Sequence, residues 1–409
     1  MYNPQLIENI ILKILNCKEK IKIIKEYETQ ILRESYKDKN YILRYNISDV
    51  HYFFSLEALE QWEKLTIQIS EKVFKNQFSL TYINNGLKYY FHKNYNNYTN
   101  QNLIDFLSNL KNNASDLLFY IPLYGINLKN KELNIGSFSL KTIEKIKEEI
   151  KEISPNSDFK FMFSPTIISD QVLLINNYQT DNDKALEITL NQTNRFIDIL
   201  NWKFSQLIQP NNDIKYIISL HPPIDENLIY FSLNNKKTIS TNFKNLSSTL
   251  PLDLNSIEKF ICNDEVVWLV RLISEKEIND FYDAILKSIH WFSQFWLEKQ
   301  NDNQLLYLAI SLEALLSESF STSSFIADRV AFILGNDKST RLELRDLTKK
   351  LYDLRSNIAH GNNINIVQKN DLKKIEVITR KTIQYAIDNR NLFDSLKQFK
   401  LSLDEKKYE

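Results

Sequence analysis

The spacing of apolar residues changes twice along the chain. Over residues 6–33, and again over residues 50–74, apolar side chains recur every three or four positions, which is typical of helices that bury one face. Short runs rich in aromatic and β-branched residues replace this pattern between residues 117 and 233 and predict strands. Helical spacing then returns and continues to the end of the chain. This pattern divides the chain into a mainly helical N-terminal region (1–110), an α+β middle region (111–265) and a helical C-terminal region (266–409).

The middle region is expected to form a sheet packed by one or two helices. The predicted strands are the apolar runs at residues 117–123, 133–140, 159–163, 172–178, 216–220 and 228–233. One long helix is predicted over residues 183–207, because its apolar positions share a broad face. Strands and helices do not alternate regularly, so an α+β arrangement is expected rather than repeated βαβ units.

The C-terminal region predicts an antiparallel helical bundle with short polar links. The five predicted helices are residues 275–298, 303–317, 323–334, 339–360 and 369–389. Gly335 and Gly361 directly follow the third and fourth of these helices, where a glycine ends a helix at low conformational cost. The expected fold class is therefore α+β and multidomain, with an all-α bundle at the C-terminus.

Composition narrows the possible chemistry. The 409 residues carry 51 basic and 51 acidic side chains, so the net charge does not indicate a partner. The five glycines are too far apart to form a dinucleotide-binding turn or a phosphate-binding loop. Cys17 and Cys262 are the only cysteines, and they cannot form a redox pair or a cysteine-rich zinc site. We therefore expect neither a cofactor nor a metal.

Two further features bear on where the protein acts. No uncharged stretch approaches the roughly 20 residues that cross a bilayer. Glu8, Lys13 and Lys18 interrupt the first twenty residues, so no signal-peptide core forms there. With only two cysteines in the chain, we expect a reduced, cytoplasmic location and no membrane partner.

The clearest chemical signal lies near the end of the fourth predicted C-terminal helix. Residues 351–361 read LYDLRSNIAHG, which places Arg355 five positions before His360. On a regular helix five steps turn a side chain by about 500°, so these two side chains would point about 140° apart. They can share one site if the last turn opens at Gly361, or if two copies of the chain pair across a two-fold axis.

The surrounding residues extend this signal into a family resemblance. LEALL at residues 312–316, IADRVA at residues 326–331 and Arg341 precede the segment LYDLRSNIAHG. This succession closely resembles the Apea-like branch of the HEPN superfamily, helical-bundle domains of ribonucleases in bacterial defence and toxin systems, over about residues 274–391.

The resemblance implies which residues act. Arg355 and His360 match the ribonuclease motif of the superfamily, and the likeness implies a homodimer formed through the bundle. Many members carry a polar residue such as Asn directly after the Arg. Here Ser356 takes that place and Asn357 follows, so the likeness gives an auxiliary polar role to this pair.

Physical chemistry supports the same two main residues. A His at the C-terminal end of a helix is favoured as imidazolium, which suits proton transfer. Arg355 can bind phosphate oxygens bidentately. RNA supplies its own nucleophile, the 2′-hydroxyl, so we expect metal-independent cleavage of an RNA substrate. Between residues 338 and 381 eleven basic side chains outnumber five acidic ones, which suits RNA, although a solvated helix face has the same pattern.

Two other residues near the motif leave alternatives open. Glu313 lies in an apolar stretch, where a carboxylate needs a partner. It is expected either to orient Arg355 or His360, or to form a structural ion pair with Arg329 or Arg345.

For the aromatic residues of the C-terminal region, a role in binding and a role in packing are both open. Tyr352, one turn before Arg355, is expected to line the site or to pack. The aromatic set His290, Trp291, Phe292, Phe295 and Trp296 could stack bases, but its helical spacing favours a core or dimer face.

Two rival functions remain at this stage. The first is a catalytically silent HEPN module that serves in dimerisation or in nucleotide or RNA binding. The second is a metal-dependent nuclease built from carboxylates of the middle region. Residues 1–265 contain no motif, and their length suggests a regulatory part that binds a trigger or an inhibitor.

Overall fold

A computed structural model describes most of the chain. The described residues are 2–129, 132–153, 172–207, 216–220, 227–234, 238–245, 252–275, 277–318, 323–360 and 367–406. The chain divides into two compact units: unit 1 comprises Met1–Phe119 and Asn177–Thr189, and unit 2 comprises Tyr120–Asn176 and Leu190–Glu409. Each unit is therefore built from two separate stretches of sequence, and most of the expected middle region shares a unit with the C-terminal helices.

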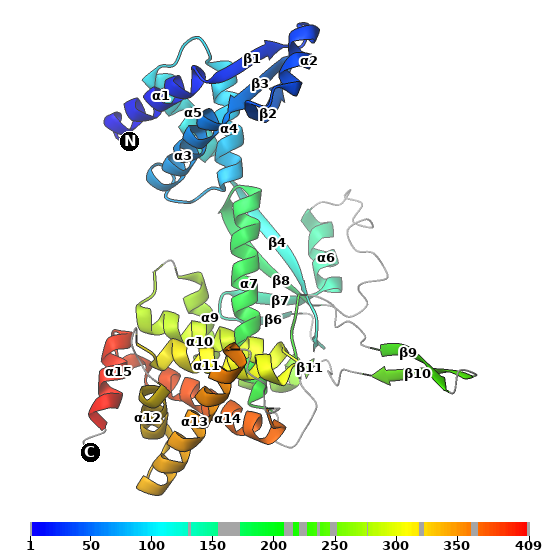
Figure 1. Ribbon diagram of the computed structural model, residues 1–409, viewed down its shortest axis with the longest axis vertical. Helices are drawn as coiled ribbons and strands as arrows, with labels where there is room; N and C mark the ends of the chain where they lie inside the picture. The colour runs from blue at the N-terminus through cyan, green and yellow to red at the C-terminus, as the bar shows by residue number, and fades with distance from the viewer. Residues whose placement is uncertain are drawn as a thin grey trace. The chain divides into compact units, whose positions relative to one another are not determined.

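Unit 1 combines helices with a small antiparallel sheet (Figure 1). Its elements are α1 (Pro4–Lys18), β1 (Ile21–Lys25), α2 (Thr29–Lys37), β2 (Tyr41–Ile47), β3 (Val50–Ser55), α3 (Leu56–Lys72), α4 (Leu80–Lys93) and α5 (Asn100–Asn112). The strands lie in the order β1-β3-β2. Trp62 of α3 is buried between Phe54 and Phe91, with ring centroids 5.4 and 5.5 Å apart. This aromatic cluster joins the sheet to helices α3 and α4.

Two stretches that the spacing predicts as helical are strands. Residues 21–25 form β1 and residues 50–55 form β3, and Ile21 lies opposite Phe54 in their antiparallel pair. Ile21 and Ile24 are three positions apart and both buried, which fits either a helix or an irregular strand. Pairing with β3 decides between them, because it satisfies the backbone hydrogen bonds of both segments. That contact is distant in sequence and does not show in local spacing.

The remaining strands and two helices lie wholly or partly in unit 2, since β4, β8 and α7 each have residues in both units. Their bounds are β4 (Ser115–Leu123), β5 (Ile126–Asn127), β6 (Glu132–Ile135), β7 (Phe138–Thr142), α6 (Ile143–Ile153), β8 (Val172–Thr180), α7 (Asn182–Ser205), β9 (Asn227–Asn234), β10 (Thr238–Asn245) and β11 (Leu252–Asp253). Four strands lie in the order β4-β8-β7-β6, and β9 pairs with β10. Phe138 of β7 stacks on Phe196 of α7 with centroids 4.9 Å apart, so α7 packs against the sheet (Figure 1).

Three strand predictions need comment. Residues 133–140 form a hairpin rather than one strand, because Gly136 adopts a φ of 58° and reverses the chain between β6 and β7. Residues 216–220 form no strand: the backbone N–H of Ile218 donates to Oδ1 of Asn201 at 2.8 Å, and its carbonyl oxygen accepts from Nδ2 of Asn201 at 3.1 Å. The predicted strand at residues 159–163 lies outside the described residues.

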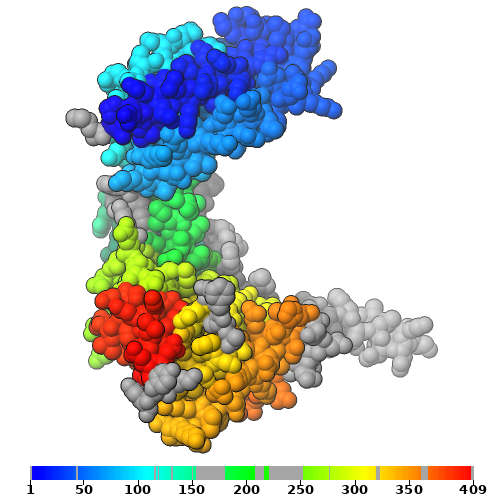
Figure 2. Space-filling model, turned by 60° about the vertical axis from the view of Figure 1, so that its left-hand side comes forward, coloured from blue at the N-terminus to red at the C-terminus, as the bar shows by residue number. Residues whose placement is uncertain are grey.

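The C-terminal part of unit 2 is a helical bundle. Its helices are α8 (Glu258–Ile261), α9 (Asp264–Ser274), α10 (Asp280–Leu297), α11 (Asn301–Leu316), α12 (Ser323–Leu334), α13 (Lys338–Ala359), α14 (Lys369–Asp388) and α15 (Leu396–Glu405), with short 3₁₀ helices at Leu254–Ile257 and Arg390–Leu392. The five predicted helices correspond to α10–α14, while α9 and α15 are additional. Figure 2 shows α15 packed beside the other C-terminal helices, where it contacts α10 and α12.

One continuous core joins the bundle to the sheet. Phe138, Phe196, Phe292, Leu308 and Ile383 all belong to it and are at most 1% exposed. The prediction of an α+β, mostly helical fold with a C-terminal helical bundle is confirmed. Within the described ranges, no helix combines the length and the apolar character needed to cross a bilayer.

Candidate functional site

Helix α13 carries the predicted catalytic segment and is fixed at its start by polar contacts. The Asp337 carboxylate accepts the backbone N–H of Thr340 at 2.9 Å, which caps the helix. Arg345 pairs with Asp328 of α12 at 2.5 Å. The partly or fully buried residues that form the apolar stripe of α13 are Leu344, Leu347, Leu351, Leu354 and Ile358. This stripe packs one face of α13 against the bundle and thereby fixes the direction in which the other side chains of α13 point.

Arg355 lies at the edge of this stripe and faces helix α11. Its Nε is 3.8 Å from Oε1 of Glu313, and the two side chains are 39% and 29% exposed. That distance is too long for a hydrogen bond. The Nε atom is shielded from solvent and has no hydrogen-bond partner among the described residues. The guanidinium is thus held near the Glu313 carboxylate by charge, and its Nε donor stays without a hydrogen bond to the described residues.

The partner of Glu313 is decided by the fold. Arg329 pairs with Glu318 and Asp404 instead, and Arg345 pairs with Asp328. Burial raises the pKa of Glu313, while the positive charge of Arg355 acts against that rise. Of the partners that the sequence leaves open for Glu313, Arg355 is the one that lies beside it.

Tyr352 packs between α13 and α11 and does not line an open surface. Its hydroxyl is 3.4 Å from the carbonyl oxygen of Ala309, and the side chain is buried. Burial raises the pKa of this phenol well above its usual value, and the nearby charge of Glu313 raises it further. Tyr352 therefore supports the backbone that carries Arg355.

His360 lies immediately beyond the last helical residue, together with other exposed polar groups. Its backbone N–H bonds to the Ser356 carbonyl at 3.0 Å, and its φ and ψ of −91° and 1° leave the helical range. Ser356, Asn357 and His360 are all exposed. Within the described part of one chain no hydrogen bond or ion pair joins His360 to Arg355. Within one chain, Arg355 is held beside Glu313 of α11, whereas His360 is exposed at the C-terminal end of α13.

The aromatic set of α10 divides into buried and partly exposed members. Phe292, Phe295 and Trp296 are at most 5% exposed and form core, in agreement with their spacing. His290 is different: its Nδ1 lies 2.7 Å from Oδ2 of the buried Asp198 on α7. Local sequence does not indicate this pair, because its members are 92 positions apart and Asp198 stands alone within an apolar stretch.

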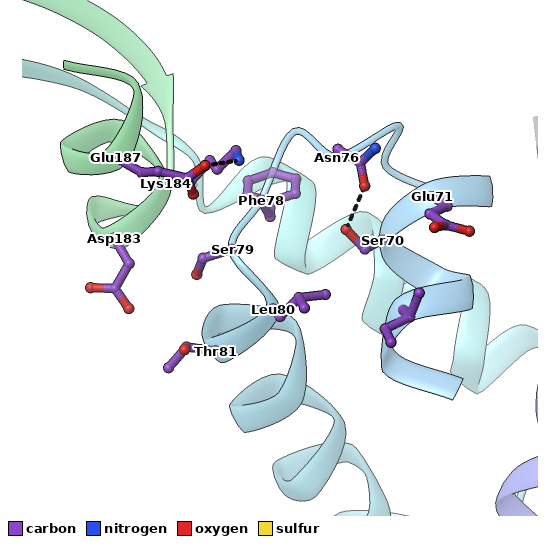
Figure 3. A pocket seen from close by; sticks show the side chains of 11 residues that line it. Ser70, Glu71, Asn76, Phe78, Ser79, Leu80, Thr81, Asp183, Lys184 and Glu187 are labelled. Atoms are coloured by element: carbon purple, nitrogen blue, oxygen red, sulfur yellow. Dashed lines mark hydrogen bonds and ion pairs between the residues drawn. The ribbon is translucent and has the colours of Figure 1, made fainter. Parts of the chain in front are cut away.

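A separate hollow lies within unit 1 and is lined by residues of α3, α4 and α7 (Figure 3). Its volume is about 700 Å³. Glu71, Asp183 and Glu187 bring three carboxylates to it, against the single cation of Lys184, which bonds to Glu187 at 2.9 Å. An excess of carboxylates repels a phosphate backbone, so this hollow does not suit RNA.

Among the residues that the structure describes, no three His, Cys, Asp or Glu side chains lie together as a metal-binding group would. Comparisons with protein-family models, with curated proteins and with solved structures gave no match to this chain. The resemblance to the HEPN superfamily therefore stays a prediction from the sequence.

Proposed function

We propose that the chain is a metal-independent endoribonuclease of the HEPN type that acts in the cytoplasm as a homodimer. The observation that carries the proposal is the state of Arg355. This guanidinium is partly exposed, lies 3.8 Å from one carboxylate, and has an Nε without an acceptor among the described residues. A positioned guanidinium whose side chain is partly exposed is suited to bind the oxygens of a phosphate.

His360 has the role of proton carrier in this proposal. It is exposed at the C-terminal end of α13, where its ring can reach a bound strand. His360 takes the proton of the ribose 2′-hydroxyl as the 2′-oxygen bonds to phosphorus, and the bond to the 5′-oxygen breaks. His360 then passes this proton to the departing 5′-oxygen, so the products carry 2′,3′-cyclic phosphate and 5′-hydroxyl ends. Arg355 stabilises the charge that develops on the phosphate.

The placement of the two groups supports the proposal of a dimer. Arg355 is anchored at α11, whereas His360 is exposed beyond the end of α13. A two-fold axis near the ends of two α13 helices brings His360 of one copy to Arg355 of the other. Ser356 and Asn357, which are exposed on the same turn, then contact RNA or the second copy.

The test is cleavage of RNA by the purified full chain in EDTA. The wild type is expected to cut RNA, and Arg355→Ala and His360→Ala should each reduce the rate about 100-fold or more. Lys350→Ala is the matched control: it removes a cation of α13 that is 57% exposed and paired with Asp371, so its rate should stay near that of the wild type. The ends of the fragments should be 2′,3′-cyclic phosphate and 5′-hydroxyl.

Other outcomes separate the rival functions. RNA binding without cleavage by the wild type favours a silent HEPN module. Cleavage that stops in EDTA but survives His360→Ala favours a metal-dependent nuclease. Either result contradicts the proposal.

A role in antiphage defence or growth arrest fits the architecture. Residues 1–265 are about twice as long as the C-terminal region, which suits a part that restrains the nuclease until a trigger binds or an inhibitor leaves. Cells that express the wild type should yield fewer phage than cells that express His360→Ala. Equal plaque counts would remove this role while leaving the enzymatic proposal intact.

A further inference from the structure

Helices α7 and α10 bring an acidic and an imidazole side chain together away from Arg355. Nδ1 of His290 lies 2.7 Å from Oδ2 of Asp198, and both residues belong to unit 2. The Asp198 side chain is 7% exposed, whereas that of His290 is 46% exposed. The carboxylate is thus inside the protein and the ring reaches the surface.

This arrangement gives the ring a defined chemical character. Asp198 occupies Nδ1, so Nε2 is the ring nitrogen left for a ligand. The hydrogen bond from Asp198 raises the pKa of His290, against the effects of burial and of the positive charge of Arg195. Arg195 is exposed and lies one turn before Asp198 on α7. The surface here presents an imidazole that favours its charged form and a permanent cation beside it.

An aromatic pair adjoins these cations. Trp291 follows His290 in sequence, and their rings are 5.3 Å apart. Trp291 also stacks on Tyr307 of α11, with centroids 5.7 Å apart and planes at 27°. Both rings of this pair are only partly buried, unlike Phe292 on the next position of α10. Partly exposed stacked rings beside positive charges are the elements with which single-strand binders hold bases and phosphates.

We propose that His290, Arg195 and Trp291 form a binding site for a nucleotide unit, in which the imidazole and the guanidinium contact the phosphate and the indole contacts the base. Asp198 holds the imidazole and positions its free nitrogen. The same chemistry is offered by a single RNA strand and by a free mononucleotide. The proposal concerns binding, and it does not depend on cleavage at Arg355 and His360.

The test is binding of a fluorescein-labelled oligonucleotide of 2′-O-methyl RNA to the full chain, followed by fluorescence anisotropy. This probe lacks the 2′-hydroxyl, so it reports binding whether or not the protein is a ribonuclease. His290→Gln, Arg195→Gln and Trp291→Leu should each raise the dissociation constant about fivefold or more. Lys287→Gln is the control, because it removes a 65% exposed cation one turn before His290 that pairs with Asp283; its binding should change less than about twofold.

A second arm distinguishes the two sources of the ligand. If AMP at millimolar concentration displaces the oligonucleotide from the wild type but not from His290→Gln, the site accepts free nucleotides. If AMP has no effect while the variants lose oligonucleotide binding, the site accepts a strand. Arg195→Gln keeps the test valid if His290→Gln fails to fold, since Arg195 is exposed. The proposal is overturned if the wild type binds neither probe, or if folded variants bind as well as Lys287→Gln does.

Discussion

Arg355 depends on one carboxylate for its position. Glu313 is 29% exposed, and burial raises its pKa while the positive charge of Arg355 acts against that rise. Glu313 touches no reacting atom in the proposed mechanism. It is a positioning residue, whose loss should change how Arg355 meets the phosphate rather than whether the protein folds.

The first prediction follows from this dependence. Glu313→Gln keeps the shape of the side chain and removes its charge, so kcat for RNA cleavage should fall about tenfold while KM changes little. Glu313→Asp should restore part of the loss, because the negative charge returns at a longer distance from Arg355. A purely structural role would instead lower the melting temperature and leave kcat of the folded fraction unchanged, which parallel thermal unfolding would reveal.

The His290–Asp198 pair predicts a pH dependence of stability. Asp198 raises the pKa of His290 above its ordinary value of 6.5 in the folded chain. A raised folded pKa gives stability that is fully present below about pH 6.5 and is lost as the pH rises through the folded value. His290→Gln should therefore lower the free energy of unfolding most at about pH 6 and least at about pH 8. Because the ring is nearly half exposed, solvent screening keeps this difference below about 1 kcal/mol.

Urea unfolding at several pH values measures that difference. The charged groups near the ring are Asp198 and Arg195, and Asp198→Asn should remove the same dependence. A difference between wild type and His290→Gln that grows toward high pH would contradict the assigned direction of the shift.

At the scale of elements, one buried arginine ties the last helix to the bundle. Arg329 of α12 is 2% exposed, contacts both carboxylate oxygens of Asp404 on α15 at 2.9 and 2.7 Å, and bonds to the Leu316 carbonyl at 2.6 Å. Glu318 adds a fourth contact at 2.8 Å. These bonds satisfy a buried cation and connect the end of α11 with α12 and α15.

Removing this arginine should destabilise unit 2. Arg329→Met leaves the Leu316 carbonyl without its donor and Asp404 without its partner, so the free energy of unfolding should fall by about 3 kcal/mol. Arg345→Met is the control, since Arg345 of α13 pairs with one carboxylate, that of Asp328 on α12, and its side chain is 37% exposed. The cost of this substitution should stay below about 1 kcal/mol. Urea unfolding followed by circular dichroism compares the two, and equal costs would contradict the role given to burial.

At the scale of the whole molecule, the proposed enzyme needs two copies of the chain. Each copy supplies a guanidinium anchored on α11 and an imidazole exposed beyond α13. If each site takes Arg355 from one copy and His360 from the other, a mixed dimer of two different inactive variants still contains one complete site.

This prediction is tested by mixing Arg355→Ala and His360→Ala after a dissociation and reassociation step. Random pairing makes about half of the dimers mixed, each with one of two sites intact, so about a quarter of the wild-type activity should return. The separate variants, treated in the same way, serve as controls and should stay inactive. No recovery, with mixed dimers demonstrated by affinity tags, would mean that each site lies within one chain.

Local sequence was sufficient for the elements whose signals repeat many times. The helices α10–α14 were foreseen because apolar residues recur over several turns in each, and glycine marks the end of α12. The segment that carries Arg355 and His360 was found because its motif is local. Hairpins and short strands were less predictable: β1 has helix-like spacing, and Ile218 is held by the side chain of Asn201 rather than by a strand.

Tertiary structure decided every feature that depends on residues far apart in the chain. The sequence determined a mostly helical α+β protein with a C-terminal bundle and a predicted RNA-cleaving motif, because periodicity and motifs are properties of neighbouring residues. Only the tertiary structure determines that Glu313 lies beside Arg355 rather than beside Arg329 or Arg345. The same holds for the pair of Asp198 and His290. Charge pairing in a partly buried environment depends on distance in space, which local spacing does not encode.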